Sequence, residues 1–428
     1  MIRIDRRTFI KSAGLPLVFP WTHSIEEAKS EKNEFQNQGP VIKSFSVFKG
    51  SGNFNRLIAM NAYDKAPKGI NGTKSIVTIL MTDGTVGIGP IGYRLADEPS
   101  LKKLKELIGK DPSGFYHWGT GKITGVKNEM KEYFFDARYA WFEGAVLDAI
   151  GKQKQLPVWK LFGEFIRNGI DPYDGTLYFE DIAHHHDVSI LAESARQSKA
   201  DGFRSIKMKL GRPAKWMPGE AGVQRDIDAF IAVREAVGSN FKLMADANNG
   251  YAQHFDWAVR LLKSCAPYDM FFMEEIFPDD TQQYKKLRET LLQDNIYIPI
   301  ADGESIVDLN QFDQYMIDGV YQYLQPDMHT CGFSNILALA RKAQSYPHIK
   351  IIPHVWQSQL GLLMSLHISK IQKNINHVED SRYTEHAISA RGYSFMDGEW
   401  FIPDKPGWGV ELSPGFEQFI VDKTIVVE

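Results

Sequence analysis

The sequence contains few cysteines. Only Cys265 and Cys331 occur among its 428 residues. Two are too few for a disulfide framework or a thiolate metal site, so we interpret them as unpaired thiols. No apolar run approaches the ~20 residues that a membrane-spanning helix needs. The formal net charge of −4 supplies no basic surface for nucleic acid. We therefore expect no membrane and no nucleic-acid partner, and 43% hydrophobic with 24% charged residues is typical of a globular protein.

The N-terminal segment 1–38 differs in character from the rest. Arg6 and Arg7 precede a modestly apolar stretch over 12–21, which resembles a bacterial twin-arginine export signal and predicts a periplasmic or exported protein. The alternative is a disordered basic tail on a cytoplasmic protein. The stretch is short, it contains Pro16 and Pro20, and no clear cleavage site follows. Residues 22–38 are predicted to be a polar linker.

The remaining chain is too long for one core and predicts two domains. Over 39–165, strands near 41–50, 56–64 and 75–90, with a hairpin turn at Asp83-Gly84, precede helices over 100–110 and 137–155. This order predicts an α+β domain. Residues 391–428 form a C-terminal segment that we expect to pack back on that domain without adding a barrel helix.

Between 166 and 390, short strands alternate with helices. The pattern predicts parallel strands with right-handed crossovers. Eight strands in this length favour a closed α/β barrel of TIM type over an open doubly wound sheet. The strands are expected near 176–179, 203–208, 241–246, 270–274, 297–301, 321–325, 349–352 and 376–379.

Charged residues stand where these apolar strands end. Because the carboxyl ends of barrel strands form the active-site face, the side chains should converge there. Three carboxylates favour a hard divalent cation, Mg²⁺ above zinc or copper, and the lysines and the histidine favour acid/base chemistry around it. Asp302 is the near alternative to Glu304. The residues are Lys207, Lys209, Asp246, Glu274, Glu304, Asp327 and His354.

In these motifs the chain resembles the mandelate racemase branch of the enolase superfamily, over nearly its whole length after residue 38. The matching motifs are Lys207-x-Lys209, Asp246-Ala247-Asn248, Glu274-Glu275, Gly303-Glu304, Pro326-Asp327, His354, Glu379 and the segment Pro406 to Leu412. The sequence departs from the family at Ile276, where proline is usual, and at Cys331, where glycine is usual. The resemblance implies a barrel with an α+β capping domain.

The resemblance also implies roles for these residues. One Mg²⁺ per subunit would be bound by Asp246, Glu274 and Glu304, and would stabilise the enediolate formed when the proton alpha to a carboxylate is removed. Enolase-superfamily sites are a well-known case of a Lys or His base that works beside magnesium. Lys209 is then the base on one face, with its pKa lowered by Lys207.

His354 serves the opposite face, and Asp327 orients its ring. Glu379 would donate a hydrogen bond to the enediolate, which requires a raised pKa. The assignment of base and acid between Lys209 and His354 stays open, because the configuration of the substrate selects the face.

The expected reaction is dehydration of an acid sugar to a 2-keto-3-deoxy acid. The alternatives are a racemase, epimerase or cycloisomerase that uses the same half-reaction, and, more distantly, an exported sugar-acid-binding protein. The substrate is expected to be a small, polyhydroxylated carboxylate. Relatives often form dimers or octamers, so a homo-oligomer is expected.

Substrate contacts are expected from the capping-domain loops 48–72 and 90–98 and from the barrel mouth. The candidates are Arg56, Tyr93, Asn248 and Trp356. Asn248 has an alternative role as a cap of the following turn, and Trp356 has one in packing. The triplet His184-His185-His186 lacks the spacing for one metal ion and is interpreted as solvated.

Overall fold

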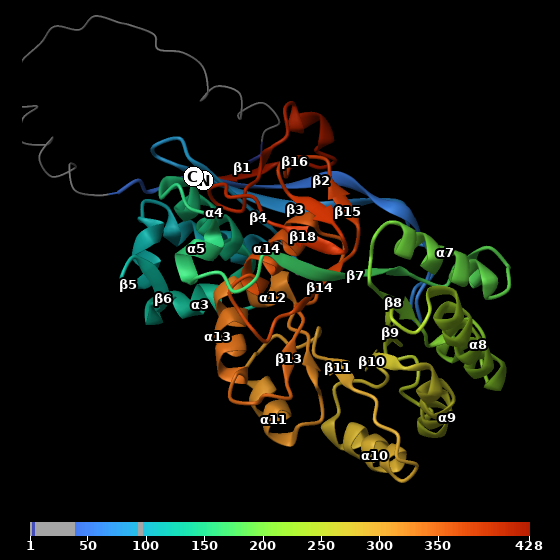
Figure 1. Cartoon of the computed structure of the whole chain (residues 1–428). Helices are drawn as coiled ribbons and strands as arrows, with labels where there is room; N and C mark the ends of the chain where they lie inside the picture. The colour runs from blue at the N-terminus through green and yellow to red at the C-terminus, as the bar shows by residue number, and fades with distance from the viewer. Residues whose placement is uncertain (1, 5–38, 93–96) are drawn as a thin grey trace, which may run out of the picture.

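The computed structural model describes residues 2–4, 39–92 and 97–428. The twin-arginine segment and Tyr93 lie outside these residues. Figure 1 shows an antiparallel sheet beside a ring of parallel strands, with helices on the outer side of that ring. No helix in the described ranges combines the length and the apolar character that crossing a membrane requires.

The antiparallel sheet is built mainly by the predicted capping domain. Its strands follow the order β1-β20-β2-β3-β4, and β15 also pairs with β2. The strand predicted over 56–64 is wrong beyond Ile58, because the chain turns away from the sheet there. The bounds are β1 (Ile2–Ile4), β2 (Ile42–Ile58), β3 (Gly69–Met81), β4 (Val86–Pro90), β15 (Tyr383–Glu385) and β20 (Ile425–Val427).

Helix α4 (Glu143–Gln153) covers β4 at very short range. A Cβ atom at Gly87 would lie 2.1 Å from the carbonyl oxygen of Ala145, and one at Gly89 would lie 2.5 Å from its nitrogen. Glycine is required at both positions because only a bare backbone fits under the helix. The predicted helix over 137–155 is therefore confirmed for most of its length, and the Asp83-Gly84 turn joins β3 to β4 as expected.

Eight parallel strands form the second body. They follow the order β13-β12-β11-β10-β9-β8-β7-β14, and Ile351 in β13 donates a backbone hydrogen bond to Asn374, three residues before β14. The strands are β7 (Gly169–Leu177), β8 (Ser205–Lys209), β9 (Lys242–Asp246), β10 (Met270–Glu274), β11 (Ile300–Asp302), β12 (Tyr323–Leu324), β13 (Lys350–Ile351) and β14 (His377–Asp380).

Seven of these strands lie where the sequence predicted them, within a few residues. The first one differs, because β7 begins at Gly169 instead of near 176. Its early residues include Pro172 and Gly175, which are typical of turns. Pairing with both β8 and β14 overrides that local preference.

The longer helices of this body alternate with its strands. Among them, α8, α9 and α13 confirm the predicted alternation of strands and helices. The bounds are α7 (Ser189–Ala200), α8 (Glu220–Val237), α9 (Phe255–Cys265), α10 (Thr281–Leu292), α11 (Gln311–Asp318), α13 (Phe333–Ala343) and α14 (Gln359–Ser369).

A layer of apolar side chains fills the barrel interior beneath the charged residues. Met244 and Phe272 belong to it, together with Tyr173, Ala301 and Ile352. Side chains two positions apart on a strand point the same way. Asp246 and Glu274, two residues beyond Met244 and Phe272, therefore project inward above this layer. The packed interior supports the site from below.

The C-terminal segment returns to the capping domain. Trp408 is fully buried, and its Nε1 donates to the carbonyl oxygen of Gly144 in α4 at 2.8 Å. Strand β18 (Glu399–Phe401) pairs with the start of β7, and β20 pairs with β2. The domain boundaries proposed from the sequence, 39–165, 166–390 and 391–428, stay predictions.

Candidate active site

Three charged residues share one level at the carboxyl ends of adjacent strands. Lys209 is paired in register with Asp246, and Asp246 with Glu274. Parallel strands in register bring equivalent strand ends together. All three side chains are buried. The predicted convergence of strand-end charges is therefore a property of the sheet register.

The two lysines bind the carboxylates between them. Lys209 forms an ion pair with Asp246. Lys207 Nζ lies 2.6 Å from a Glu274 oxygen, 3.0 Å from Glu379 and 3.6 Å from Asp246. Its ammonium also lies 5.4 Å from the ring centroid of Tyr173 below. Buried charges are tolerated here because each has an opposite charge within contact distance.

His354 and Asp327 form the expected pair. Their backbones make an isolated parallel bridge, and His354 Nδ1 lies 2.8 Å from Asp327 Oδ2. The other ring nitrogen, Nε2, lies 3.3 Å from Glu304 Oε2. Glu304 therefore faces the site. Its alternative Asp302 does not, because its carboxylate accepts hydrogen bonds from Tyr284 and from the nitrogen of Gly303.

The charges shift the pKa values of this group in opposite directions. Burial disfavours the charged form of Asp246, but Lys209 and Lys207 outweigh it and hold its pKa at about 2. Burial raises the pKa of Glu274 to about 8, because Lys207 opposes it only in part and the other carboxylates add to it. His354 is buried as well, yet Glu304, Glu379 and Asp327 raise its pKa to about 10.

Two expectations about protonation are wrong in this structure. The pKa of Lys209 is raised well above its ordinary value, since Asp246 outweighs both burial and the repulsion from Lys207. The pKa of Glu379 is lowered, because Lys207 and His354 outweigh its burial and the nitrogen of Val355 donates to it at 3.0 Å. Glu379 is a carboxylate here, so it accepts hydrogen bonds.

A cavity of about 600 Å³ opens above these residues. Both Lys209 and His354 reach it, together with Asn248, Glu304, Glu379 and Trp356. Six further lining residues come from the β2–β3 region of the capping domain and from the barrel mouth. They are Phe54, Tyr63, Lys68, Asn71, Tyr178 and Gln357.

Sequence reasoning found only part of this lining. Phe54, Tyr63, Lys68 and Asn71 lie within the predicted capping loop 48–72, whereas Tyr178 and Gln357 lie outside the predicted loops. Tyr178 lies in the strand predicted near 176–179 and directly follows the end of β7, but it is uncharged and so was not among the charged strand ends. No local motif marks Lys68 or Asn71, which reach the cavity only because the β2–β3 hairpin lies over the barrel mouth.

The four predicted substrate contacts have different outcomes. Trp356 lines the cavity, and its ring centroid lies 5.3 Å from those of Phe54 and Tyr178. Asn248 also lines it, with its Nδ2 donating to Glu275 at 3.0 Å and its backbone nitrogen to Asp246 at 2.8 Å.

Arg56 is a wrong prediction, and Tyr93 lies outside the described residues. Arg56 donates to Ser198 at 2.7 Å and forms an ion pair with the buried carboxylate of Asp174. Its guanidinium is thus engaged away from the cavity. The triplet 184–186 follows α6 (Glu180–Ala183) in an exposed turn and adds nothing to the site.

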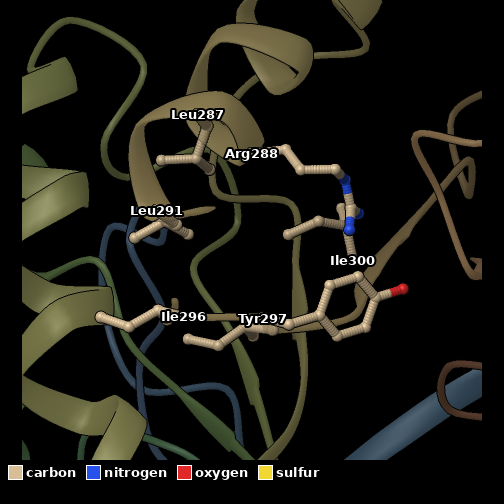
Figure 2. Close-up of a pocket in the computed structure, with 7 residues that line it drawn as sticks. Leu287, Arg288, Leu291, Ile296, Tyr297 and Ile300 are labelled. Carbon is tan, nitrogen blue, oxygen red and sulfur yellow. The ribbon is translucent and has the colours of Figure 1, made fainter. Parts of the chain in front are cut away.

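A second hollow, between α10 and β11, is far smaller. Figure 2 shows its lining, which includes Arg288 and Tyr297 among aliphatic side chains. Its volume of about 10 Å³ is close to that of a single water site. Ile300, in its wall, begins β11 at the amino end of the strand. The hollow is too small for a sugar and lies at the wrong end of the barrel.

The residues of the main cavity fit a hard cation by their chemistry. Every candidate ligand is a carboxylate oxygen, and their mutual repulsion contributes to the raised pKa of Glu274. Asn248 Oδ1 is buried beside them and has no hydrogen-bond partner among the described residues. Within the described ranges, no three acidic, histidine or cysteine side chains stand at ligand distances from one point. The ammonium groups of Lys207 and Lys209 now bind the carboxylates that a cation would use.

Comparison with known proteins then identifies the family. A model described as "Enolase C-terminal domain-like" matches residues 190–415, more than half of the chain. The chain belongs to this family. The resemblance to the mandelate racemase branch of the enolase superfamily is confirmed, and with it the fold of a TIM-type barrel with an N-terminal capping domain.

Individual relatives of this enolase-family chain include sugar-acid enzymes. A D-galactarolactone cycloisomerase from Agrobacterium fabrum is 26% identical over 355 residues, which cover 79% of this chain and 88% of the relative. A solved galacturonate dehydratase from Geobacillus sp. is 26% identical with a TM-score of 0.75, covering 87% of this chain and 95% of that one.

A third similar protein carries a metal. It is a mandelate racemase/muconate lactonizing protein from Geobacillus sp. Y412MC10, complexed with magnesium and tartrate. It is 25% identical to this enolase-family chain, with a TM-score of 0.76 over 89% of this chain and 95% of its own.

Proposed function

We propose that this protein is a Mg²⁺-dependent acid-sugar dehydratase, which removes the proton alpha to a carboxylate and then expels the 3-hydroxyl group. One observation carries the proposal. Lys209 and His354 both reach the same cavity, where Lys209 pairs with Asp246 beside Glu274 and His354 lies 3.3 Å from Glu304. Similarity to a galacturonate dehydratase over most of both chains supports the reaction class.

Asp246, Glu274 and Glu304 would hold one Mg²⁺ per subunit. When bound, the cation would neutralise the negative charge that proton removal places on the substrate carboxylate. Two of these residues end β9 and β10, and Glu304 follows β11 by two residues, which supports this set because the three strands are neighbours in the sheet. Lys207, held by Glu274 and Glu379, would add a fixed positive charge next to the same carboxylate.

Lys209 would act as the base and His354 as the acid. Among the described residues, the only carboxylate in direct contact with Lys209 is Asp246, a proposed metal ligand. A cation that takes this carboxylate would leave Nζ free to accept the alpha proton. His354 contacts Asp327 through Nδ1, and its Nε2 lies 3.9 Å from Glu379. Neither carboxylate is a proposed metal ligand, so both contacts would persist when the cation is bound. Its Nε2 would therefore keep a proton to give to the departing hydroxyl group, which leaves as water.

The aromatic wall would bind the carbon skeleton of the substrate. Trp356 stacks on Phe54, packs against the tilted ring of Tyr178 and lines the cavity. Flat apolar rings bind the C–H faces of sugars, while the amides of Asn71 and Gln357 at the same cavity suit hydroxyl groups. Lys68 also lines it, but its ammonium is already paired with Asp64 at 2.6 Å. The lining therefore favours a sugar whose far end is uncharged.

A cycloisomerase is the second candidate, because a D-galactarolactone cycloisomerase is 26% identical over 79% of this chain. The first half of that reaction would use the same base and metal, and a ring oxygen would then leave in place of water, so that a cyclic substrate opens to a keto acid. A racemase or epimerase would give no keto product. The acid and base that line the cavity favour catalysis over mere binding of a sugar acid.

A substrate screen tests the proposal. The purified protein with Mg²⁺ would be incubated with mono- and diacid sugars in both open-chain and cyclic forms, and 2-keto-3-deoxy products would be detected by carbonyl derivatisation. The control is Lys242→Met, which removes a lysine at the opposite end of the barrel. Keto product from cyclic substrates alone would assign a cycloisomerase, turnover without any keto product would assign a racemase or epimerase, and binding without turnover of any sugar acid would contradict all of these enzymes.

We also propose that the protein is exported in folded form and assembles as a homo-oligomer. Arg6-Arg7 and the weakly apolar stretch after them support export. A route for folded proteins suits an enzyme that acquires its metal before leaving the cytoplasm.

A further inference from the structure

A second histidine lies behind the Asp327–His354 pair. His329, in the short helix α12 (Met328–Cys331), has a side chain with 0% exposure, and its Nδ1 lies 3.5 Å from Asp327 Oδ2. Neither of its ring nitrogens makes a hydrogen bond within the part of the chain that the structure describes. The proposed function gives this residue no role, because it is not among the residues that line the cavity.

The two oxygens of Asp327 are used differently. Oδ1 accepts a hydrogen bond from the backbone N–H of Thr330 at 2.7 Å, and this bond caps the N-terminus of α12. Oδ2 accepts His354 Nδ1 at 2.8 Å and is also the oxygen nearest His329. A carboxylate oxygen has two lone pairs. Oδ2 can therefore accept the N–H of His354 and still offer a lone pair to the His329 ring, which lies in contact with it at 3.5 Å.

The surroundings of His329 leave space for an imidazole. A Cβ atom added at Gly361 would lie 2.6 Å from His329 Nε2, and a Cβ atom added at Gly92 would lie 2.8 Å from His329 Cβ. The two glycines therefore leave the space that the imidazole occupies. Burial, followed by the positive charge of Lys74 in β3, lowers the pKa of His329 to about 4. The ring is thus neutral under ordinary conditions and carries one N–H.

An apolar filler would suit this position better if packing were the only requirement. Burying a polar ring without hydrogen bonds is unfavourable, because its ring nitrogens lose the water that hydrogen-bonds them in the unfolded chain. A leucine would fill a similar volume without that penalty. The contact with Asp327 is the one feature of His329 that a leucine would lose.

We infer that His329 is a positioning residue that acts through Asp327, holding Oδ2 in line with His354 Nδ1 so that Nε2 of His354 is presented to the substrate. This inference rests on the proposed function for its effect on catalysis, but the contact it describes belongs to the protein alone. His329 touches no substrate, so its removal should lower kcat and leave KM nearly unchanged.

Three substitutions separate this role from packing. In H329N, the side-chain Nδ2 can occupy the place of His329 Nδ1. In H329Q, the side-chain nitrogen lies nearer to the place of His329 Nε2. In H329L, the side chain has the shape of asparagine but no hydrogen-bond donor. We expect H329L and H329Q to lose about 10-fold in kcat, with H329N within about 2-fold of wild type. In a D327N background H329L should cause no further loss, because the two changes act through one contact. Equal losses in all three variants that follow their melting temperatures would overturn the inference.

A second measurement needs no substrate. In the full chain labelled with ¹⁵N-histidine, the proton shared by His354 Nδ1 and Asp327 should give a downfield resonance, identified by its loss in H354N. It should persist in H329N and shift upfield or broaden in H329L. An unchanged resonance in H329L would overturn the inference. If no sugar acid is turned over by the wild type, the proposed function fails while this resonance still tests the role of His329.

Discussion

Lys209 and Asp246 occupy paired positions at the ends of β8 and β9, and their buried side chains form an ion pair. In the proposed function the same carboxylate binds Mg²⁺ and the same lysine is the base. Metal binding and release of the base are therefore coupled through one residue. Asn248 holds the other oxygen of Asp246 at 2.8 Å, so the carboxylate keeps its direction when its partner changes.

Metal removal should abolish turnover. After treatment with a chelator, activity should be lost and Mg²⁺ should restore it, because the substrate carboxylate then has no divalent charge opposite it. D246N and E274Q should each lower kcat by about 10²–10³-fold, the range seen when one group that stabilises a developing charge is removed. Steady-state kinetics and metal content by mass spectrometry measure both effects.

Asp171→Asn is the matched control for these acidic residues, since Asp171 lies near the amino end of β7 and pairs with Lys242. It should retain kcat. Full activity in a metal-free D246A/E274A double variant would rule out the metal site.

The two faces of the cavity should separate by isotope exchange. K209A should abolish exchange of the alpha proton with deuterated solvent, because no base is left to remove it. H354N should block loss of the hydroxyl group yet retain exchange. Each loss should be about 10²–10⁴-fold, as is typical of a positioned acid or base. Proton NMR in deuterated water follows exchange, and carbonyl detection follows dehydration.

If His354 is the base and Lys209 the acid, the two exchange results should swap. A racemase would show exchange from one enantiomer in each variant and no keto product. Normal turnover and exchange in the K209A/H354N double variant is the result that neither assignment survives.

The charged strand ends could be predicted because they depend on a short pattern. An apolar run followed by a carboxylate places that carboxylate at the mouth of any parallel barrel, so Asp246 and Glu274 could be located from the sequence. The protonation states could not be predicted. Each protonation state depends on which opposite charge lies within contact distance. The attraction of Lys209 to Asp246, with which it forms an ion pair, raises its pKa more than the repulsion from Lys207 lowers it.

The cavity lining was harder to predict for a similar reason. Arg56 has a side chain suited to a sugar acid, but the buried carboxylate of Asp174 binds it first. Asn71 reaches the cavity because β2 and β3 form a long hairpin over the barrel mouth, with Asn71 opposite Asn53. Contacts of this kind depend on how two domains pack, and a linear sequence contains no local signal for them.

The export signal should depend on its two arginines. A fusion of residues 1–40 to a folded fluorescent reporter should leave the cytoplasm of a bacterium that has the twin-arginine route, and replacing Arg6 and Arg7 by lysine should keep it inside. Cell fractionation measures the distribution. Retention of the wild-type fusion in the cytoplasm, with a known twin-arginine signal exported alongside, would leave the N-terminus as a basic tail.

The stability of the fold should depend on pH through Glu143. This first residue of α4 is fully buried, and burial raises its pKa from 4.5 to about 7 despite hydrogen bonds from Ser334 and Tyr116. The folded state therefore binds a proton that the unfolded state releases between pH 4.5 and 7. The contribution of this residue to the free energy of unfolding is fully present below about pH 4.5. It falls by up to roughly 3 kcal/mol as the pH rises to about 7.

Urea unfolding at pH 5, 6, 7 and 8 measures this change, and E143Q should remove part of the slope because glutamine does not ionise. Glu385, with a pKa also raised to about 7 by burial, should account for a share of the remainder. Glu129→Gln is the control, since Glu129 is exposed and its loss should leave the slope intact. If E143Q lowered the free energy of unfolding by the same amount at every pH, the slopes of E143Q and wild type would be identical. That result would mean that the substitution only removes hydrogen bonds and that Glu143 does not titrate in this range.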